Sequence, residues 1–164
     1  MNFSESMLTK SLEMKNILIV IIAVSTLQLS AQKSNPNYDE ALAKKVGADD
    51  YGMKSYMFVI LKTGSNTSED EAKMTEAFNG YMKNMNNMVD AEKLVVAGSI
   101  GKNDKNYRDI FILNETDIEK AKALSQTDLA INAKYLDYDI FPWYGSAALS
   151  EYLEASGKVR KVGM

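Results

Sequence analysis

The side chains that most often carry out catalysis are missing from this sequence. Its 164 residues include no histidine and no cysteine. The lack of cysteine excludes disulfides, a thiol nucleophile, a zinc–thiolate site and a lipid-modified N-terminal cysteine. The lack of histidine removes the commonest general base and the commonest transition-metal ligand. The candidates that remain are carboxylates, an arginine beside an aromatic residue, and a row of methionines.

Two aspartates and three methionines have spacings that metal sites use. Asp137 and Asp139 share one face of a predicted strand, about 6.5 to 7 Å apart, and could line a polar cavity or bind a hard cation. A cation needs more oxygen ligands than two, and such a face more often meets solvent. Met82, Met85 and Met88 offer thioethers that select copper(I), but their spacing drifts around a helix and methionine commonly fills cores. We therefore predict no metal site and no cofactor.

Arg108 follows Tyr107 directly in another predicted strand. Its guanidinium could clamp a ligand carboxylate with two hydrogen bonds, and Lys102 and Lys105 in the preceding loop could add charge. The alternative is a surface arginine whose stem packs flat, and both interpretations stay open. We take Arg108 and Tyr107 as candidate ligand-binding residues.

Composition excludes several classes of protein. Hydrophobic residues make up 46% of the chain and charged residues 25%, which is unlike a disordered or collagen-like chain. The formal net charge of −3 gives no basic field for nucleic acid, so we expect no nucleic-acid partner. Gly98 and Gly101 lack the spacing and context of a dinucleotide-binding loop.

The N-terminal segment has the pattern of a secretory signal. An apolar run of thirteen residues from Ile17 to Leu29 follows Lys15 and precedes Ser30-Ala31-Gln32. A membrane span needs about 20 apolar residues, so an uncleaved anchor is the less favoured alternative. We predict a signal peptide over residues 1–32, in which residues 1–13 are a possible upstream extension before Met14. The mature chain would then start near Gln32 or Lys33, be periplasmic or secreted, and have no stable membrane anchor.

The rest of the chain alternates between strand-like and helix-like patterns. Residues 33–54 read as a leader and a short helix that stops at Gly47, and residues 157–164 as a basic tail. Ser68 with Glu71, and Thr116 with Glu119, are typical of capping boxes at helix starts. We predict strands over 55–62, 94–97, 107–114 and 135–142. We also predict a long helix from the Ser68 capping box to about Asp90, a helix after Thr116 that carries Ile118, Ala121 and Leu124, a helical turn or short helix over 128–134, and a last helix over 147–155.

This order predicts an α+β, ferredoxin-like βαββαβ fold. Its four-stranded antiparallel sheet would carry the helices on one face, with extra N-terminal and C-terminal helices. The strands over 55–62 and 107–114 are apolar on both faces, although a sheet with one wet face should alternate. Such an exposed patch is best covered by a second copy packing sheet against sheet, so we predict a homodimer. Alternatively, the last helix covers part of the second face.

Six segments follow one another in an order that is typical of a known family. They are YMKNMNNM at 81–88, EKLVVAG at 92–98, YRDIFIL at 107–113, IEKA at 118–121, TD at 127–128 and FPWYGS at 141–146. In this order they resemble the YCII-related proteins. The resemblance covers roughly residues 38–153 and places a YCII-like domain at residues 55–156. It implies a dimeric α/β barrel with a small-molecule pocket beside the sheet, near the dimer interface.

The resemblance also implies a site. Members of the family are suspected enzymes, with a histidine on the first helix and an aspartate before the last strand as proposed acid and base. These positions fall on Tyr81 and Asp128 here. A tyrosine titrates near 10 and a histidine near 6.5, so Tyr81 would donate a proton or a hydrogen bond rather than act as a base. The alternative is that Tyr81 is a core residue of its helix and Asp128 caps the next turn.

The chain departs from the family pattern at other positions too. Ser99 stands where the family usually has proline, Leu129 where a proline follows the aspartate, and Glu92 and Lys134 where glycine is usual or common. We include Ser99 with Arg108 and Tyr107 as a predicted ligand-binding residue.

The resulting functional hypothesis is an exported protein that binds a small organic ligand, with weak proton-transfer or lyase-type chemistry through Tyr81 and Asp128 and with Arg108 holding an anionic group. The alternative is a non-catalytic binding or interaction module that keeps only the fold.

Overall fold

The computed structural model describes residues 35–159 and 161. The chain divides into two compact units, Met1–Tyr38 and Asp39–Met164. In the first unit the described part is a turn, in which the Tyr38 backbone N–H donates to the Asn35 carbonyl. All helices and strands described below belong to the second unit.

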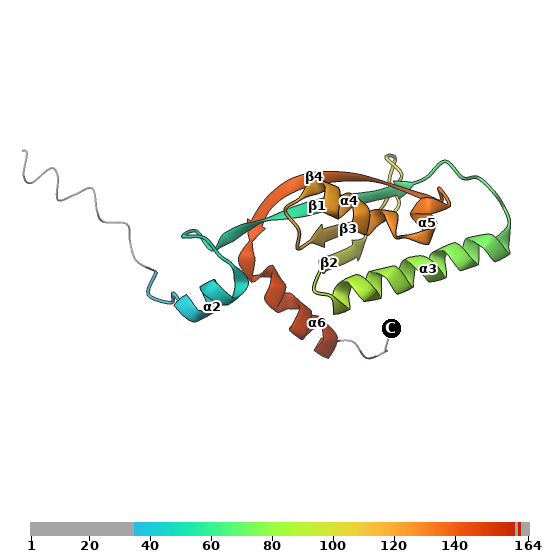
Figure 1. Ribbon diagram of the computed structural model, residues 1–164. Coiled ribbons are helices and arrows are strands. Elements are labelled where there is room, and N and C mark those ends of the chain that lie inside the picture. The colour runs from blue at the N-terminus through green and yellow to red at the C-terminus, as the bar shows by residue number, and fades with distance from the viewer. Residues whose placement is uncertain (1–34, 160, 162–164) are drawn as a thin grey trace, which may run out of the picture. The chain divides into compact units, whose positions relative to one another are not determined.

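The second unit is an α+β structure built on a four-stranded antiparallel sheet (Figure 1). The strand order is β2-β3-β1-β4, which is the ferredoxin-like order, so the predicted fold class is confirmed. The elements in chain order are α2 (Glu40–Val46), β1 (Met53–Thr63), α3 (Glu71–Asp90), β2 (Leu94–Ser99), β3 (Tyr107–Leu113), α4 (Ile118–Gln126), α5 (Leu129–Asn132), β4 (Leu136–Ser146), the 3₁₀ helix η2 (Ala147–Glu151) and α6 (Tyr152–Val159).

The last strand is longer than predicted. β4 continues past Pro142 to Ser146 and pairs with β1 along its whole length. Proline has no backbone N–H to give to a ladder, so it is tolerated in an edge strand, and β4 is an edge strand of this sheet. The chain then enters η2 and α6, so the final helical region ends at Val159, inside the predicted tail.

The capping boxes predicted at Ser68 and Thr116 are wrong. Asp70 caps α3 and accepts from the Lys73 backbone N–H, and Asp117 caps α4 in the same way. A carboxylate satisfies the free N–H groups at a helix start and also interacts favourably with the positive end of the helix dipole. Ser68 instead accepts from the Asp70 backbone N–H, one step before the helix.

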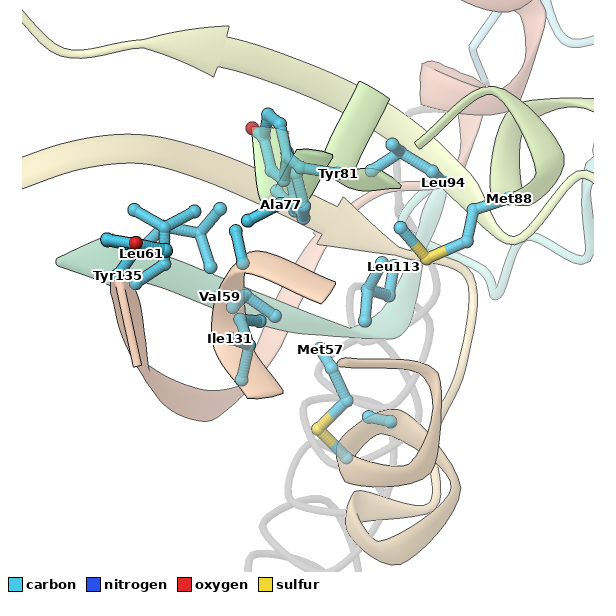
Figure 2. Close-up of a cluster of buried hydrophobic side chains, with 14 residues drawn as sticks. Met57, Val59, Leu61, Ala77, Tyr81, Met88, Leu94, Leu113, Ile131 and Tyr135 are labelled. Carbon is cyan, nitrogen blue, oxygen red and sulfur yellow. The ribbon is translucent and has the colours of Figure 1, made fainter. Parts of the chain in front are cut away.

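The main core lies between the sheet and the helices α3, α4 and α5 (Figure 2). Alternate residues of β1 point into it, namely Met57, Val59 and Leu61. Antiparallel partners share a face, so Phe111 and Leu113 of β3 point the same way. Helix α3 contributes Ala77, Tyr81 and Met88 from its apolar stripe.

The opposite face of the sheet is only partly covered. Tyr56, Val95 and Ile112 are buried there, and Leu149 of η2 packs against them. The Tyr56 hydroxyl donates to the Ser146 carbonyl at 2.9 Å, which fastens the end of β4. The large side chains of β4 nearby remain exposed, with Phe141 at 48% and Trp143 at 37%. The last helical region thus covers part of this face, as the alternative interpretation allowed.

No helix within the described residues has the length and apolar character needed to cross a membrane.

Candidate functional site

A cavity of about 360 Å³ opens between α3, the strands β2 and β3, and α6. It lies on the same side of the sheet as the helices, because Tyr81 and Phe111 belong both to its wall and to the main core. Its walls are mostly apolar, which is typical of small-molecule pockets of this size. The lining residues are Tyr81, Met82, Met85, Val89, Leu94, Val95, Ala97, Gly98, Ser99, Asp109, Phe111, Tyr152, Leu153 and Ser156.

Strand register places the polar groups of the cavity. Ser99 is the partner of Asp109 across β2 and β3, and Asp109 is the partner of Leu61 in β1. Since Leu61 points into the main core, Ser99 and Asp109 share the helix-covered face of the sheet. The Ser99 hydroxyl donates to an Asp109 carboxylate oxygen at 2.6 Å, so the two side chains form one polar cluster.

Tyr81 stands against this cluster from the opposite wall. Its ring is stacked on Phe111 at an interplanar angle of 13°, with 6.1 Å between centroids. Burial raises the pKa of the Tyr81 phenol well above its usual range, and the negative charges of Asp109 and Asp128 and the polar contact of the hydroxyl with Asp109 raise it further. Arg108 acts in the opposite direction as the smallest of these influences. The phenol is therefore protonated at neutral pH and available as a donor.

Asp128 is buried but does not line this cavity. Its carboxylate caps α5, accepting from the backbone N–H groups of Ala130 at 2.8 Å and Ile131 at 3.2 Å. The Asn84 side-chain amide approaches its other oxygen at 3.4 Å. Burial raises the pKa of Asp128, and these hydrogen bonds partly counteract the increase. The structure thus gives Asp128 the capping position, and its charge acts on Tyr81 without a hydrogen bond between the two side chains among the described contacts.

Arg108 and Tyr107 also lie outside the cavity lining. Tyr107 pairs with Lys62 of β1, whose neighbour Leu61 points to the helix side, so Tyr107 belongs to the other face of the sheet. Arg108 is exposed and lies at the irregularity of the β1–β3 register, where its carbonyl accepts from the Ile100 backbone N–H. Of the predicted site residues, the structure therefore brings together Tyr81 and Ser99.

The structure places the candidate metal-ligating methionines and aspartates in other roles. Met82 and Met85 line the cavity and Met88 is buried in the core. Asp139 forms an ion pair with Lys62 at 2.8 Å on the far face of the sheet. Throughout the part of the chain that the structure describes, no group of three or more carboxylates is arranged to hold a metal ion.

Sequence reasoning missed Asp109 and the contribution of α6. Asp109 precedes Phe111 and Leu113 by two and four residues, and this period places all three on one face of β3. A carboxylate that shares one strand face with two core residues could have been recognised in the sequence as a candidate polar group of the site. The lining by Tyr152, Leu153 and Ser156 had no such signal, because it depends on how the chain turns after β4.

No protein-family model matches the chain, and no curated protein matches it. Neither comparison therefore bears on the resemblance to the YCII-related proteins. The function must be inferred from the cavity and its polar cluster.

Proposed function

We propose that this protein binds a small, largely apolar organic molecule in the cavity beside α3. Tyr81, Ser99 and Asp109 would make the polar contacts, and the methionine and aromatic side chains would hold the body of the ligand. One observation carries the proposal: a hollow with apolar walls contains a convergent polar cluster next to a tyrosine whose pKa is strongly perturbed.

The same cluster supports weak proton-transfer chemistry. A protonated phenol can donate to a ligand carbonyl or a developing enolate, and a neighbouring carboxylate orients it. Here the polar contact of the hydroxyl is with Asp109, while Asp128 influences it through charge. Tyr81 would therefore act as the donor, with Asp109 rather than Asp128 as its immediate partner.

We also propose that the chain is a YCII-like protein that forms a homodimer. Support comes from two positions where the family has glycine, since Glu92 has φ 55° and Lys134 has φ 63°. This left-handed conformation favours glycine, which is the residue that the resemblance leads us to expect at both positions. Support for the dimer comes from the exposed β4 side chains of Phe141 and Trp143 on the uncovered face.

Export is the remaining part of the proposal. The predicted signal at residues 1–32 lies outside the described residues. Mass spectrometry of protein recovered from the expressing cells is expected to find a chain starting near Gln32 or Lys33. Recovery with Met1 or Met14 still attached would contradict export by cleavage.

The alternative, a non-catalytic interaction module, is favoured by a different observation. Phe141 and Trp143 are exposed on β4 and point to the same, partly covered face of the sheet. Aromatic residues are enriched at protein interfaces. In this case the β4 face would bind partners and the cavity would have no ligand.

Ligand-observed NMR with 2-phenylethanol, a small neutral amphiphile, tests the cavity directly. We expect binding by the wild-type protein, weaker binding by Tyr81→Phe, and loss of binding by Ala97→Phe, whose ring would fill the space facing Phe111. Phe141→Ala, on the uncovered face, is the control and should bind normally. Equal binding by the wild type and Ala97→Phe would favour the interaction module.

A further inference from the structure

We propose that the cavity selects ligands that carry an ammonium group on an apolar body. This inference rests on the proposed function, and it specifies the class of ligand. It differs from the anionic ligand expected from Arg108 in the sequence.

The charge of the lining is the first observation. Within the described residues 35–159 and 161, the cavity wall contains one ionisable side chain apart from its tyrosines, and this is Asp109. Its hydrogen-bond donor is Ser99, a neutral hydroxyl that leaves the negative charge uncompensated. No ion pair with a lysine or arginine of the described residues involves Asp109. A cationic group of a ligand would supply the missing counter-charge.

The electrostatic field at the Tyr81 phenol also favours a cation. Asp109 and Asp128 both act on Tyr81 as negative charges, and Arg108 opposes them more weakly than either. An anionic head group placed between Tyr81 and Asp109 would meet net repulsion. An ammonium group there would be attracted, because its charge is opposite to that of the carboxylates.

The apolar walls suit the same class of ligand. The rings of Tyr81, Phe111 and Tyr152 all line the cavity. Aromatic faces attract cations, and this attraction increases when the cation is desolvated. The thioethers of Met82 and Met85 add polarizable surface for the body of the molecule. The cavity volume of about 360 Å³ is enough for a compact molecule with one ring.

Three probes of nearly equal size separate charge from shape. They are 2-phenylethylamine, which is cationic at neutral pH, 2-phenylethanol, which is neutral, and 3-phenylpropanoate, which is anionic. Dissociation constants are measured by calorimetry or ligand-observed NMR at low ionic strength. We expect the amine to bind at least ~tenfold more tightly than the carboxylate, with the alcohol in between.

Asp109→Asn is the informative variant. Asparagine keeps the size of the side chain and an oxygen that accepts from Ser99, but it removes the charge. We expect the preference for the amine over the alcohol to disappear in Asp109→Asn. Asp137→Asn is the matched control, because it makes the same change at an exposed position on the other face of the sheet. This control should keep the full preference.

The outcomes distinguish this inference from the proposed function. Binding of the alcohol with no preference between amine and carboxylate, or a preference that survives Asp109→Asn, would overturn the inference and leave the cavity function standing. Failure of all three probes to bind at millimolar concentration would overturn both. If Asp109→Asn does not fold, the order of affinities in the wild-type protein still decides, since a carboxylate that binds as well as the amine contradicts the inference.

Discussion

Burial has opposite consequences for the two residues that the sequence singled out. It raises the pKa of both the Tyr81 phenol and the Asp128 carboxyl, because a low-dielectric interior disfavours the charged form of an acid. For Tyr81 this keeps the hydroxyl protonated and useful as a donor. For Asp128 it means that the charged form is less favourable in the folded state than in water, although the cap of α5 uses it.

The Asp128 carboxyl should therefore give a pH-dependent contribution to stability. Between the usual aspartate pKa of about 3.9 and the raised value in the fold, the folded state binds more protons than the unfolded state. The free energy of unfolding contributed by this group consequently falls as the pH rises through that window. Asp128→Asn keeps an oxygen for the Ala130 and Ile131 N–H groups but cannot titrate.

Urea denaturation of the wild type and Asp128→Asn across acidic to neutral pH measures this effect. We expect the stability of the wild type relative to the variant to decrease as the pH rises. Asp137→Asn makes the same substitution at an exposed aspartate and is measured alongside as the control for the loss of a carboxylate as such. If the stability of the wild type and that of Asp128→Asn depend on pH in the same way, burial does not raise the pKa of the Asp128 carboxyl.

At the scale of elements, close backbone contacts hold the loop after β1 against the connection between α5 and β4. Lys134 lies between α5 and β4 with φ 63°, and its carbonyl accepts from the Asn66 backbone N–H. Gly64 lies against the same connection, so closely that a Cβ there would fall 2.1 Å from the Lys134 carbonyl oxygen. A side chain at position 64 would therefore push the loop after β1 away from the start of β4.

Replacement of Lys134 by glycine should stabilise the protein. A non-glycine residue in the left-handed region costs about 1–2 kcal/mol, and glycine loses part of this gain through its greater freedom in the unfolded chain. We expect Lys134→Gly to raise the free energy of unfolding by roughly 0.5–1 kcal/mol. The measurement is chemical denaturation at neutral pH.

Lys83→Gly is the matched control, because Lys83 is an exposed lysine within α3. Its replacement should cost about 1 kcal/mol, since glycine is a poor helix former. Destabilisation of similar size in both variants would mean that the left-handed conformation at Lys134 stores no strain.

The whole Asp39–Met164 unit has two unequal sheet faces. Helices α3, α4 and α5 cover one of them, and η2 covers part of the other. The remaining apolar surface on the second face includes Phe141 and Trp143, and Trp143 packs against the buried Tyr56 with 5.7 Å between ring centroids. Gly145 leaves room for this indole, since a Cβ there would lie 2.1 Å from the ring.

The proposed homodimer predicts that a charge on this face separates the subunits. In analytical ultracentrifugation at micromolar concentration we expect a dimer for the wild type and a monomer for Phe141→Asp, whose dissociation constant should rise by at least ~tenfold. Tyr51→Asp is the control, because Tyr51 is 77% exposed in the turn before β1. A monomeric wild type would refute the dimer and leave the cavity on the helix side untouched.

The order of strands and helices was predictable because hydrophobic periodicity reflects local geometry. Apolar runs marked β1 and β3, and the repeat of apolar residues in α3 marked the helix and placed Tyr81 on its inner face. Helix boundaries were less predictable, since Ser68 and Asp70 compete for one capping position and only the folded chain resolves the choice.

The amino-acid sequence alone determined the α+β class, the order of the sheet elements and the absence of histidine and cysteine chemistry, because these depend on local patterns and composition. The tertiary structure decided which polar groups meet. It joined Ser99 to Asp109 opposite Tyr81, assigned Asp128 to a helix cap and left Arg108 outside the cavity wall. These outcomes depend on strand register and on the path of the chain after β4, and a shift of one residue in register would turn Asp109 to the other face of the sheet.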